Sequence, residues 1–145
     1  MGSKKSQSAE LNSVFVYGTL KQGQVNHGII APSCQEVRPA ILQGLLYDLP
    51  YGYPAAVDGD GVIKGEVVKL RHVRQALPVL DKLEDYYGPG CAGNMYDRVV
   101  REAILADGSK AAVYVYLWNK PHALAGLGVI NPQGEWPVNT GPNPH

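Results

Sequence analysis

The feature that most constrains the fold is a run of four β-prone residues, VFVY at positions 14–17, which stops at Gly18. β-Branched and aromatic side chains favour strands, and a short apolar run bounded by a turn residue is typical of a buried strand. Glycine suits the end of such a run because it lets the backbone turn sharply and lets another group approach closely. The sequence therefore predicts a buried first strand followed by a tight turn in the segment YGTL, residues 17–20.

Further strands are expected along the chain. Apolar and β-prone residues predict them at 40–49, 62–70, 95–105 and 111–118, and the last of these is the alternating run AAVYVYLW. Clusters of Gly, Pro and Asp predict turns at LPYGYP (49–54), DGDG (58–61) and DGS (107–109). The DGDG turn, with the short run at 55–57 before it, predicts a hairpin, and Gly44 predicts a bulge or a point of close packing.

One main helix is expected. Apolar residues with helical spacing occur at Val73, Ala76, Leu77, Leu80 and Leu83. Pro78 interrupts that pattern because it lacks an N–H group and clashes with the preceding turn. We therefore expect an irregular turn up to Leu77, then a short helix that has Pro78 in its first turn and carries Asp81 and Glu84. Five or six strands with one helix favour a small mixed α+β domain, built as a curled sheet or barrel.

The chain is expected to form a single domain between two flanking segments. Its 145 residues have the length of one ordinary domain, which we place at 13–120. Residues 1–12 are polar and predict a flexible arm, and the first ten lack the apolar stretch of a signal peptide. Residues 121–145 are rich in Pro and Gly, so they wrap the domain or are partly disordered. The apolar residues available for wrapping are Leu127, Val129, Ile130 and Trp136.

Composition narrows the expected partners and location. Lys plus Arg and Asp plus Glu number 13 each, which argues against a nucleic-acid binder held by its net positive field. No apolar run approaches the roughly 20 residues that span a bilayer, so we expect no membrane partner. Two cysteines without close spacing, Cys34 and Cys91, suit a reducing compartment, and we expect a cytoplasmic protein.

The spacing of the chemistry-bearing residues disfavours several kinds of site. We expect no metal and no cofactor, because no ligand spacing accompanies the histidines His27, His72, His122 and His145. The segment GTLKQG at 18–23 follows a strand but lacks the GxxxxGK order of a phosphate-binding loop. A nucleophilic Cys–His pair stays open as an alternative, although neither cysteine lies in a recognisable motif.

Two features stand out as candidate functional sites. Successive N–H groups in the turn after the first strand could form a concave cradle for an anion or oxyanion, although a plain strand-end turn is commoner. Glu84 lies next to an apolar stripe, where a pocket edge would raise the pKa of its carboxyl. A solvated carboxylate on a helix is the commoner interpretation of that residue. Asp81 lies three residues before Glu84, so the two could share a helix face.

Five segments in order resemble the γ-glutamylcyclotransferase-like superfamily, most closely the AIG2-like branch that includes γ-glutamylamine cyclotransferases. They are VFVYGTLKQGQVNH, GLLYDLPYGYPAAV, GEVVKL, LDKLEDYY and MYDRVV, and they fall between residue 13 and about residue 119. The resemblance implies a small mixed β-barrel with short flanking helices. It also implies a pocket in which the YGTL turn faces Glu84.

The resemblance assigns roles to residues that match the family's motifs. It implies that Glu84 is the catalytic acid and base, and it implies substrate-binding roles for Tyr17, Gly18, Thr19, Leu20, Tyr53, Tyr96 and Arg98. Tyr53 and Pro54 match a YP turn, and Tyr96 and Arg98 match a Y-x-R segment. The chain departs from the family at Val25, where a proline is common, and in the glycine-rich segment 87–94.

The reaction implied by the resemblance releases 5-oxoproline and an amine from a γ-glutamyl compound. The substrate supplies its own nucleophile, the α-amino group, whose reference pKa is about 8. Folding the substrate so that this amine meets the γ-carbonyl can supply about 7–11 kcal/mol, and one carboxylate can serve as base and then as acid. The alternative hypothesis is a non-catalytic module on the same fold that binds a small ligand or has a regulatory role.

Overall fold

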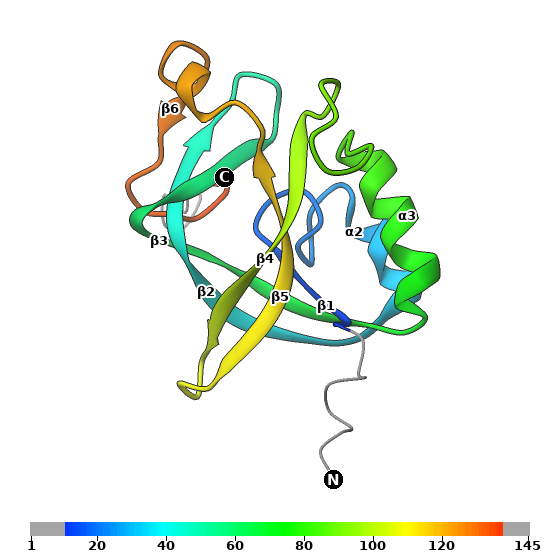
Figure 1. Ribbon diagram of the computed structural model, residues 1–145. Coiled ribbons are helices and arrows are strands. Elements are labelled where there is room, and N and C mark those ends of the chain that lie inside the picture. The colour runs from blue at the N-terminus through cyan, green and yellow to red at the C-terminus, as the bar shows by residue number, and fades with distance from the viewer. Residues whose placement is uncertain (1–10, 138–145) are drawn as a thin grey trace, which may run out of the picture.

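The computed structural model describes residues 11–137 and shows a closed barrel of five strands with its main helix packed against one side (Figure 1). The strands are β1 (Ser13–Val16), β2 (Cys34–Asp48), β3 (Pro54–Leu70), β4 (Tyr96–Leu105) and β5 (Lys110–Trp118). Their order is β3-β1-β5-β4-β2, and pairing of β2 with β3 closes the ring. The β1–β5 pair is parallel and the other pairs are antiparallel. The expected mixed β-barrel of the α+β class is confirmed.

The longest pairing joins β2 and β3, and the turn between these strands lies in the LPYGYP segment, as expected. β3 runs without interruption through the DGDG segment, so the turn predicted at 58–61 is wrong. The glycines there allow close approach instead, since a Cβ atom at Gly59 would lie 2.5 Å from Cγ of Leu45. The register shifts between Gln43 and Leu45, where residues 58–61 of β3 lie opposite Gly44 alone, so the extra residues are on β3. Gly44 is the expected point of close packing, because a Cβ atom there would lie 2.8 Å from Cδ1 of Ile63. The hairpin turns at residues 49–53.

The main helix, α3 (Val73–Leu83), begins earlier than expected and contains Pro78 in its interior. An interior proline costs about 3 kcal/mol. The buried face of the helix offsets that cost, because burial of side chains such as Val73 and Leu80 contributes roughly 1.5–3 kcal/mol each. Glu84 is not within the helix but follows it as the C-cap residue, and its N–H donates to the carbonyl of Leu80 at 2.9 Å.

The apolar residues form two layers, one within the barrel and one between the barrel and α3. Phe15 belongs to the layer drawn from the five strands alone, whereas Val14 and Val16 belong to the layer that includes α3. Both faces of β1 are therefore covered, which explains the unbroken apolar run and confirms the buried first strand. Two short helices, α2 (His27–Ile30) and η1 (Ala31–Ser33), lead from the turn after β1 to β2.

The segment after β5 packs on the barrel as far as the structure describes it. It forms a 3₁₀ helix, η2 (Pro121–Gly126), and a two-residue strand, β6 (Val129–Ile130), that pairs with β2. Leu124 is buried, and the expected contacts of Leu127 and Trp136 with the core are confirmed. Val129 and Ile130 are exposed, so the expectation that they pack is wrong: they form an edge strand with open faces. Residues 1–10 of the expected arm and residues 138–145 of the tail lie outside the described residues.

Candidate active site

A cavity of about 250 Å³ opens where β1 ends, between the C-terminal end of α3 and the barrel. Seven of the residues expected at a site line it, namely Tyr17, Gly18, Thr19, Leu20, Tyr53, Glu84 and Tyr96. These residues come from β4 and from three loops that are distant in the sequence. Asn26, Asp85, Met95 and Tyr116 also line the cavity, and sequence reasoning did not single them out as site residues.

The YGTL turn follows β1 because Gly18 fits where no other residue does. A Cβ atom at Gly18 would lie 2.8 Å from both Cγ and Cδ of the Pro54 ring. Asn26 makes two hydrogen bonds to Thr19, the residue after Gly18. Its backbone N–H donates to the Thr19 carbonyl at 2.8 Å, and its Nδ2 donates to Thr19 Oγ1 at 2.9 Å. Nδ1 of His27 lies 2.9 Å from the carbonyl of Leu20.

These contacts use the carbonyl groups of the turn and leave its N–H groups unused. Within residues 11–137, the backbone N–H groups of Gly18, Thr19 and Leu20 have no hydrogen-bond acceptor. Gly18 and Leu20 are buried and Thr19 is half-buried, so three successive N–H groups remain available to a ligand in the adjoining cavity. Such a row of donors is suited to an oxyanion or a carboxylate. The sequence signal for Asn26 was its place in the QVNH segment, which resembles the family's pattern.

Glu84 is one of two acids that line the cavity, and its environment favours the protonated form. Burial raises the pKa of the Glu84 carboxyl to about 7, and the neighbouring charge of Asp85 adds to the shift. The carboxyl is therefore close to half ionised at neutral pH. A group with this property can both accept and return a proton at that pH.

Two buried tyrosines line the cavity together with Glu84, and each donates a hydrogen bond to a backbone carbonyl. The hydroxyl of Tyr17 donates to the Tyr116 carbonyl at 2.6 Å, and the hydroxyl of Tyr96 donates to the Pro54 carbonyl at 2.7 Å. Burial, together with the charge of Glu84, raises the pKa of both phenols well above the ordinary value. Both side chains therefore stay neutral, and they fix the shape of the cavity.

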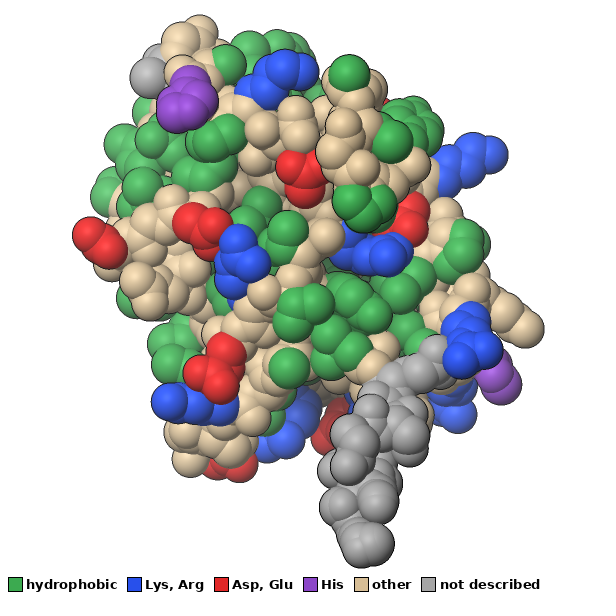
Figure 2. Space-filling model, in the orientation of Figure 1, with side chains coloured by type: hydrophobic (Ala, Val, Ile, Leu, Met, Phe, Trp, Pro, Cys, Tyr) green, Lys and Arg blue, Asp and Glu red, His purple; other side chains and the backbone are tan. Residues whose placement is uncertain are grey.

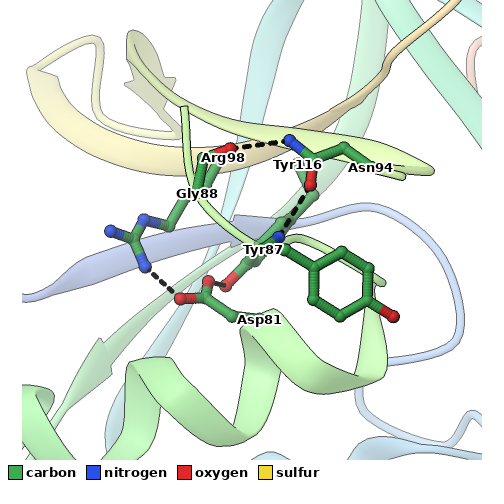
Figure 3. Close-up of polar contacts among 6 residues, drawn as sticks. All are labelled: Asp81, Tyr87, Gly88, Asn94, Arg98 and Tyr116. Atoms are coloured by element: carbon green, nitrogen blue, oxygen red, sulfur yellow. Dashed lines mark hydrogen bonds and ion pairs between the residues drawn. The ribbon is translucent and has the colours of Figure 1, made fainter. Parts of the chain in front are cut away.

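Arg98 is the one expected site residue that does not line the cavity. Its Nη1 lies 2.5 Å from Oδ2 of Asp81, and its guanidinium centre lies 5.2 Å from the ring centres of both Tyr86 and Tyr114. The other carboxylate oxygen of Asp81 accepts a hydrogen bond from the Tyr116 hydroxyl at 2.7 Å (Figure 3). Asp81 thus links α3 to strands β4 and β5.

The glycine-rich segment between α3 and β4 is organised by the buried side chain of Asn94. Its Oδ1 accepts from the Tyr87 N–H at 2.7 Å, and its Nδ2 donates to the Gly88 carbonyl at 2.8 Å (Figure 3). The same Nδ2 also donates to Oδ1 of Asp97 at 3.0 Å. These bonds close the loop on itself beside the entrance of the cavity. The loop therefore sets where Asp85 and Tyr87 lie.

Other kinds of site have no support in the described part of the chain. No three His, Cys, Asp or Glu side chains of residues 11–137 are grouped to hold a metal ion, and Cys34 and Cys91 are free. None of the helices in that range is both long and apolar enough to cross a membrane. On the face shown in Figure 2, basic and acidic side chains are interspersed and form no continuous basic surface.

The cavity thus brings a carboxyl group with a raised pKa together with backbone N–H groups that have no acceptor among residues 11–137, inside a small mixed barrel. The chain belongs to the γ-glutamyl cyclotransferase, AIG2-like family, because the sequence model of that family matches residues 14–138. It is 31% identical over 108 residues to the γ-L-glutamyl-butirosin B γ-glutamyl cyclotransferase of Niallia circulans, covering 74% of this chain and 67% of that protein. It is 35% identical over 101 residues to a protein of Halalkalibacterium halodurans named a putative γ-glutamylcyclotransferase, and the match covers 68% of this chain and 83% of that protein.

Solved structures support the same fold. An AIG2-like protein from Mus musculus superposes with a TM-score of 0.60 at 24% identity, covering 77% of this chain and 79% of that one. YkqA from Bacillus subtilis superposes with a TM-score of 0.61 at 23% identity and covers 88% of this chain. The match spans 40% of YkqA, so this chain corresponds to less than half of that protein. The family and the named relatives indicate that the chain is a γ-glutamyl cyclotransferase enzyme.

Proposed function

We propose that this protein releases 5-oxoproline and a free amine from a γ-glutamyl compound, with Glu84 as the general base and then the general acid. The observation that carries the proposal is that Glu84 and residues 18–20 line one cavity, and that the backbone N–H groups of residues 18–20 have no acceptor among the described residues. The raised pKa of the Glu84 carboxyl, about 7, matches a proton carrier that works at neutral pH.

In the proposed reaction, the α-amino nitrogen of the substrate attacks its own γ-carbonyl carbon. Glu84 accepts the proton lost by that nitrogen as the new C–N bond closes the five-membered ring. The protonated Glu84 then gives the proton to the departing nitrogen, and the old γ-C–N bond breaks. Atoms and charge balance without an enzyme nucleophile, so neither Cys34 nor Cys91 has a part in this mechanism.

Backbone donors at residues 18–20 would bind one of the two oxygen centres that carry negative charge. These are the α-carboxylate of the glutamyl group and the oxyanion of the tetrahedral intermediate. Both suit donors that are fixed in place before the reaction, as Asn26 fixes the turn at Thr19. The tyrosine wall formed by Tyr17 and Tyr96 limits the space, which favours a folded conformation of the substrate.

The direct test is release of 5-oxoproline by the purified protein from a panel of γ-glutamyl amines and γ-glutamyl peptides. We expect release from at least one γ-glutamyl amine, with the amine formed in equal amount. A protein that releases nothing from any of these compounds, yet binds them in calorimetry, would instead be the non-catalytic binding module considered from the sequence.

A further inference from the structure

One carboxylate and one tyrosine of the cavity lining are each in contact with a further, exposed tyrosine. Asp85 and Tyr53 line the cavity, and the Tyr87 hydroxyl donates to Oδ1 of Asp85 at 3.0 Å. The ring of Tyr51 lies 5.8 Å from that of Tyr53 at an angle of 37°. Tyr51 and Tyr87 keep 53% and 62% of their surface exposed, so their rings remain open to a ligand. We call these four residues the acidic rim.

The charged side chains that line the cavity are acidic. Its lining among residues 11–137 includes the carboxyl groups of Glu84 and Asp85 but no Lys, Arg or His. Arg98 is outside the lining and already paired with Asp81, and Lys21 lines a separate hollow that also holds Glu66 and Glu135. Around Asp85, away from the N–H groups of residues 18–20, this negative charge attracts cations and repels anions.

Aromatic faces next to a carboxylate add to this preference. An organic ammonium group is attracted to the face of a tyrosine ring as well as to a negative charge. Asp85, Tyr53 and Glu84 line the same cavity, and Asp85 directly follows Glu84 in the chain. The rim therefore adjoins the point where the leaving group of a γ-glutamyl substrate would depart.

We propose that the acidic rim selects γ-glutamyl compounds whose leaving amine carries a second, protonated amino group, and that Asp85 is the specificity-determining residue. This inference rests on the proposed function and narrows its substrate class. With the glutamyl group held at residues 18–20 and its γ-amide at Glu84, the leaving group has to extend past Asp85 toward Tyr51 and Tyr87. The distal ammonium takes no part in bond making or breaking, because it only binds.

The test uses three γ-glutamyl amides of similar length that differ in the charge at the far end of the leaving group. The leaving amines are 1,4-diaminobutane, butylamine and 4-aminobutyrate, which carry a positive charge, no charge and a negative charge at that end. We expect kcat/KM to fall in that order, with at least about a tenfold preference for the cationic over the neutral amide. The preference should shrink when the salt concentration rises from 20 mM to 0.5 M, because added salt screens the attraction.

Asp85→Asn removes the charge and retains the shape. The backbone of Asp85 is left-handed, with φ of 53°, and asparagine tolerates that conformation well. We expect the ratio of kcat/KM for cationic and neutral amides to fall to within about threefold of unity in this variant. The control is Asp58→Asn, on the surface pair with Arg101 away from the cavity, which should keep the wild-type ratio.

The outcomes separate the two proposals. A wild-type ratio near or below unity, or an unchanged ratio in Asp85→Asn, would overturn the selection of cations by the rim while leaving the cyclotransferase proposal intact. Release of 5-oxoproline from none of the three amides or the wider panel would overturn the proposed function and this inference with it.

Discussion

Replacing Asp81 with asparagine tests how the end of α3 is held against the barrel. The substitution retains the size of the side chain but removes the charge that pairs with Arg98 at 2.5 Å. It also weakens the acceptor of the Tyr116 hydroxyl, which lies 2.7 Å from Oδ1. Hydrogen bonds to charged groups contribute about 1.5–3 kcal/mol each, and removal of one partner leaves the guanidinium without its counter-charge.

Solvent reduces the contribution of this ion pair to stability, because the side chains of Arg98 and Asp81 are 25% and 21% exposed. We expect a loss of about 2–3 kcal/mol in the free energy of unfolding, measured by urea denaturation. At roughly 3 °C for each kcal/mol, Tm should fall by roughly 6–9 °C. Turnover should fall as well, because Tyr116 lines the cavity and Glu84 follows Asp81 by three residues.

Asp58→Asn is the matched control for this substitution. Asp58 pairs with Arg101 at 2.7 Å, but its side chain is 64% exposed. Its loss should therefore change the unfolding free energy by less than about 1 kcal/mol. An Asp81→Asn variant no less stable than Asp58→Asn would refute the view that this network fixes α3 to the barrel.

Three further predictions address the cavity and the C-terminal segment. Gly18→Ala places a Cβ atom 2.8 Å from the Pro54 ring, so the turn must shift and kcat/KM should fall about tenfold or more; steady-state kinetics with a competent substrate will check this. Because the folded protein holds a proton on Glu84 that the unfolded chain releases, the unfolding free energy should fall as pH rises from 4.5 to about 7. Glu84→Gln should flatten that fall in urea unfolding curves recorded across the range. Truncation after residue 120 removes the buried side chain of Leu124, so the free energy of unfolding should fall by about 3 kcal/mol or more while the turnover of the folded protein is retained. Loss of turnover in a truncated protein that still folds would contradict this prediction.

The sequence anticipated the parts of the fold that local pattern determines. The VFVY run gave a strand because its alternate side chains enter two different apolar layers, and either layer alone would have buried only half of them. Gly44 was expected at a bulge, and the register of β2 with β3 shifts there. In both cases the residue types required by the tertiary structure are also those that favour the local conformation.

The failures come from long-range packing that outweighs local preference. The DGDG segment has turn chemistry, but its glycines let β3 pass close to Leu45 in one continuous strand. Pro78 disfavours a helix, but the buried face of α3 keeps the helix intact across it. In both places the deciding contacts are with residues distant in the sequence, which no local pattern reports.

At the site, too, the sequence predicted some residues correctly and one residue wrongly. The YGTL turn and Glu84 were expected to line one pocket, and they do. Arg98 was expected there from its motif, whereas it pairs with Asp81 between two tyrosine rings. A motif position records that a residue type is needed, but it does not distinguish contact with a substrate from support of a neighbouring element.

The most direct test of the central claim is the turnover of Glu84→Gln on a γ-glutamyl substrate that the wild type is first shown to use. Glutamine keeps the size and hydrogen bonding of the side chain but cannot accept the proton of the α-amino group. We predict a fall in kcat of about 10²–10⁴-fold with a much smaller change in KM, because the lost contribution belongs mainly to the transition state. Release of 5-oxoproline at close to the wild-type rate by folded Glu84→Gln would contradict the assignment of Glu84 as the proton carrier.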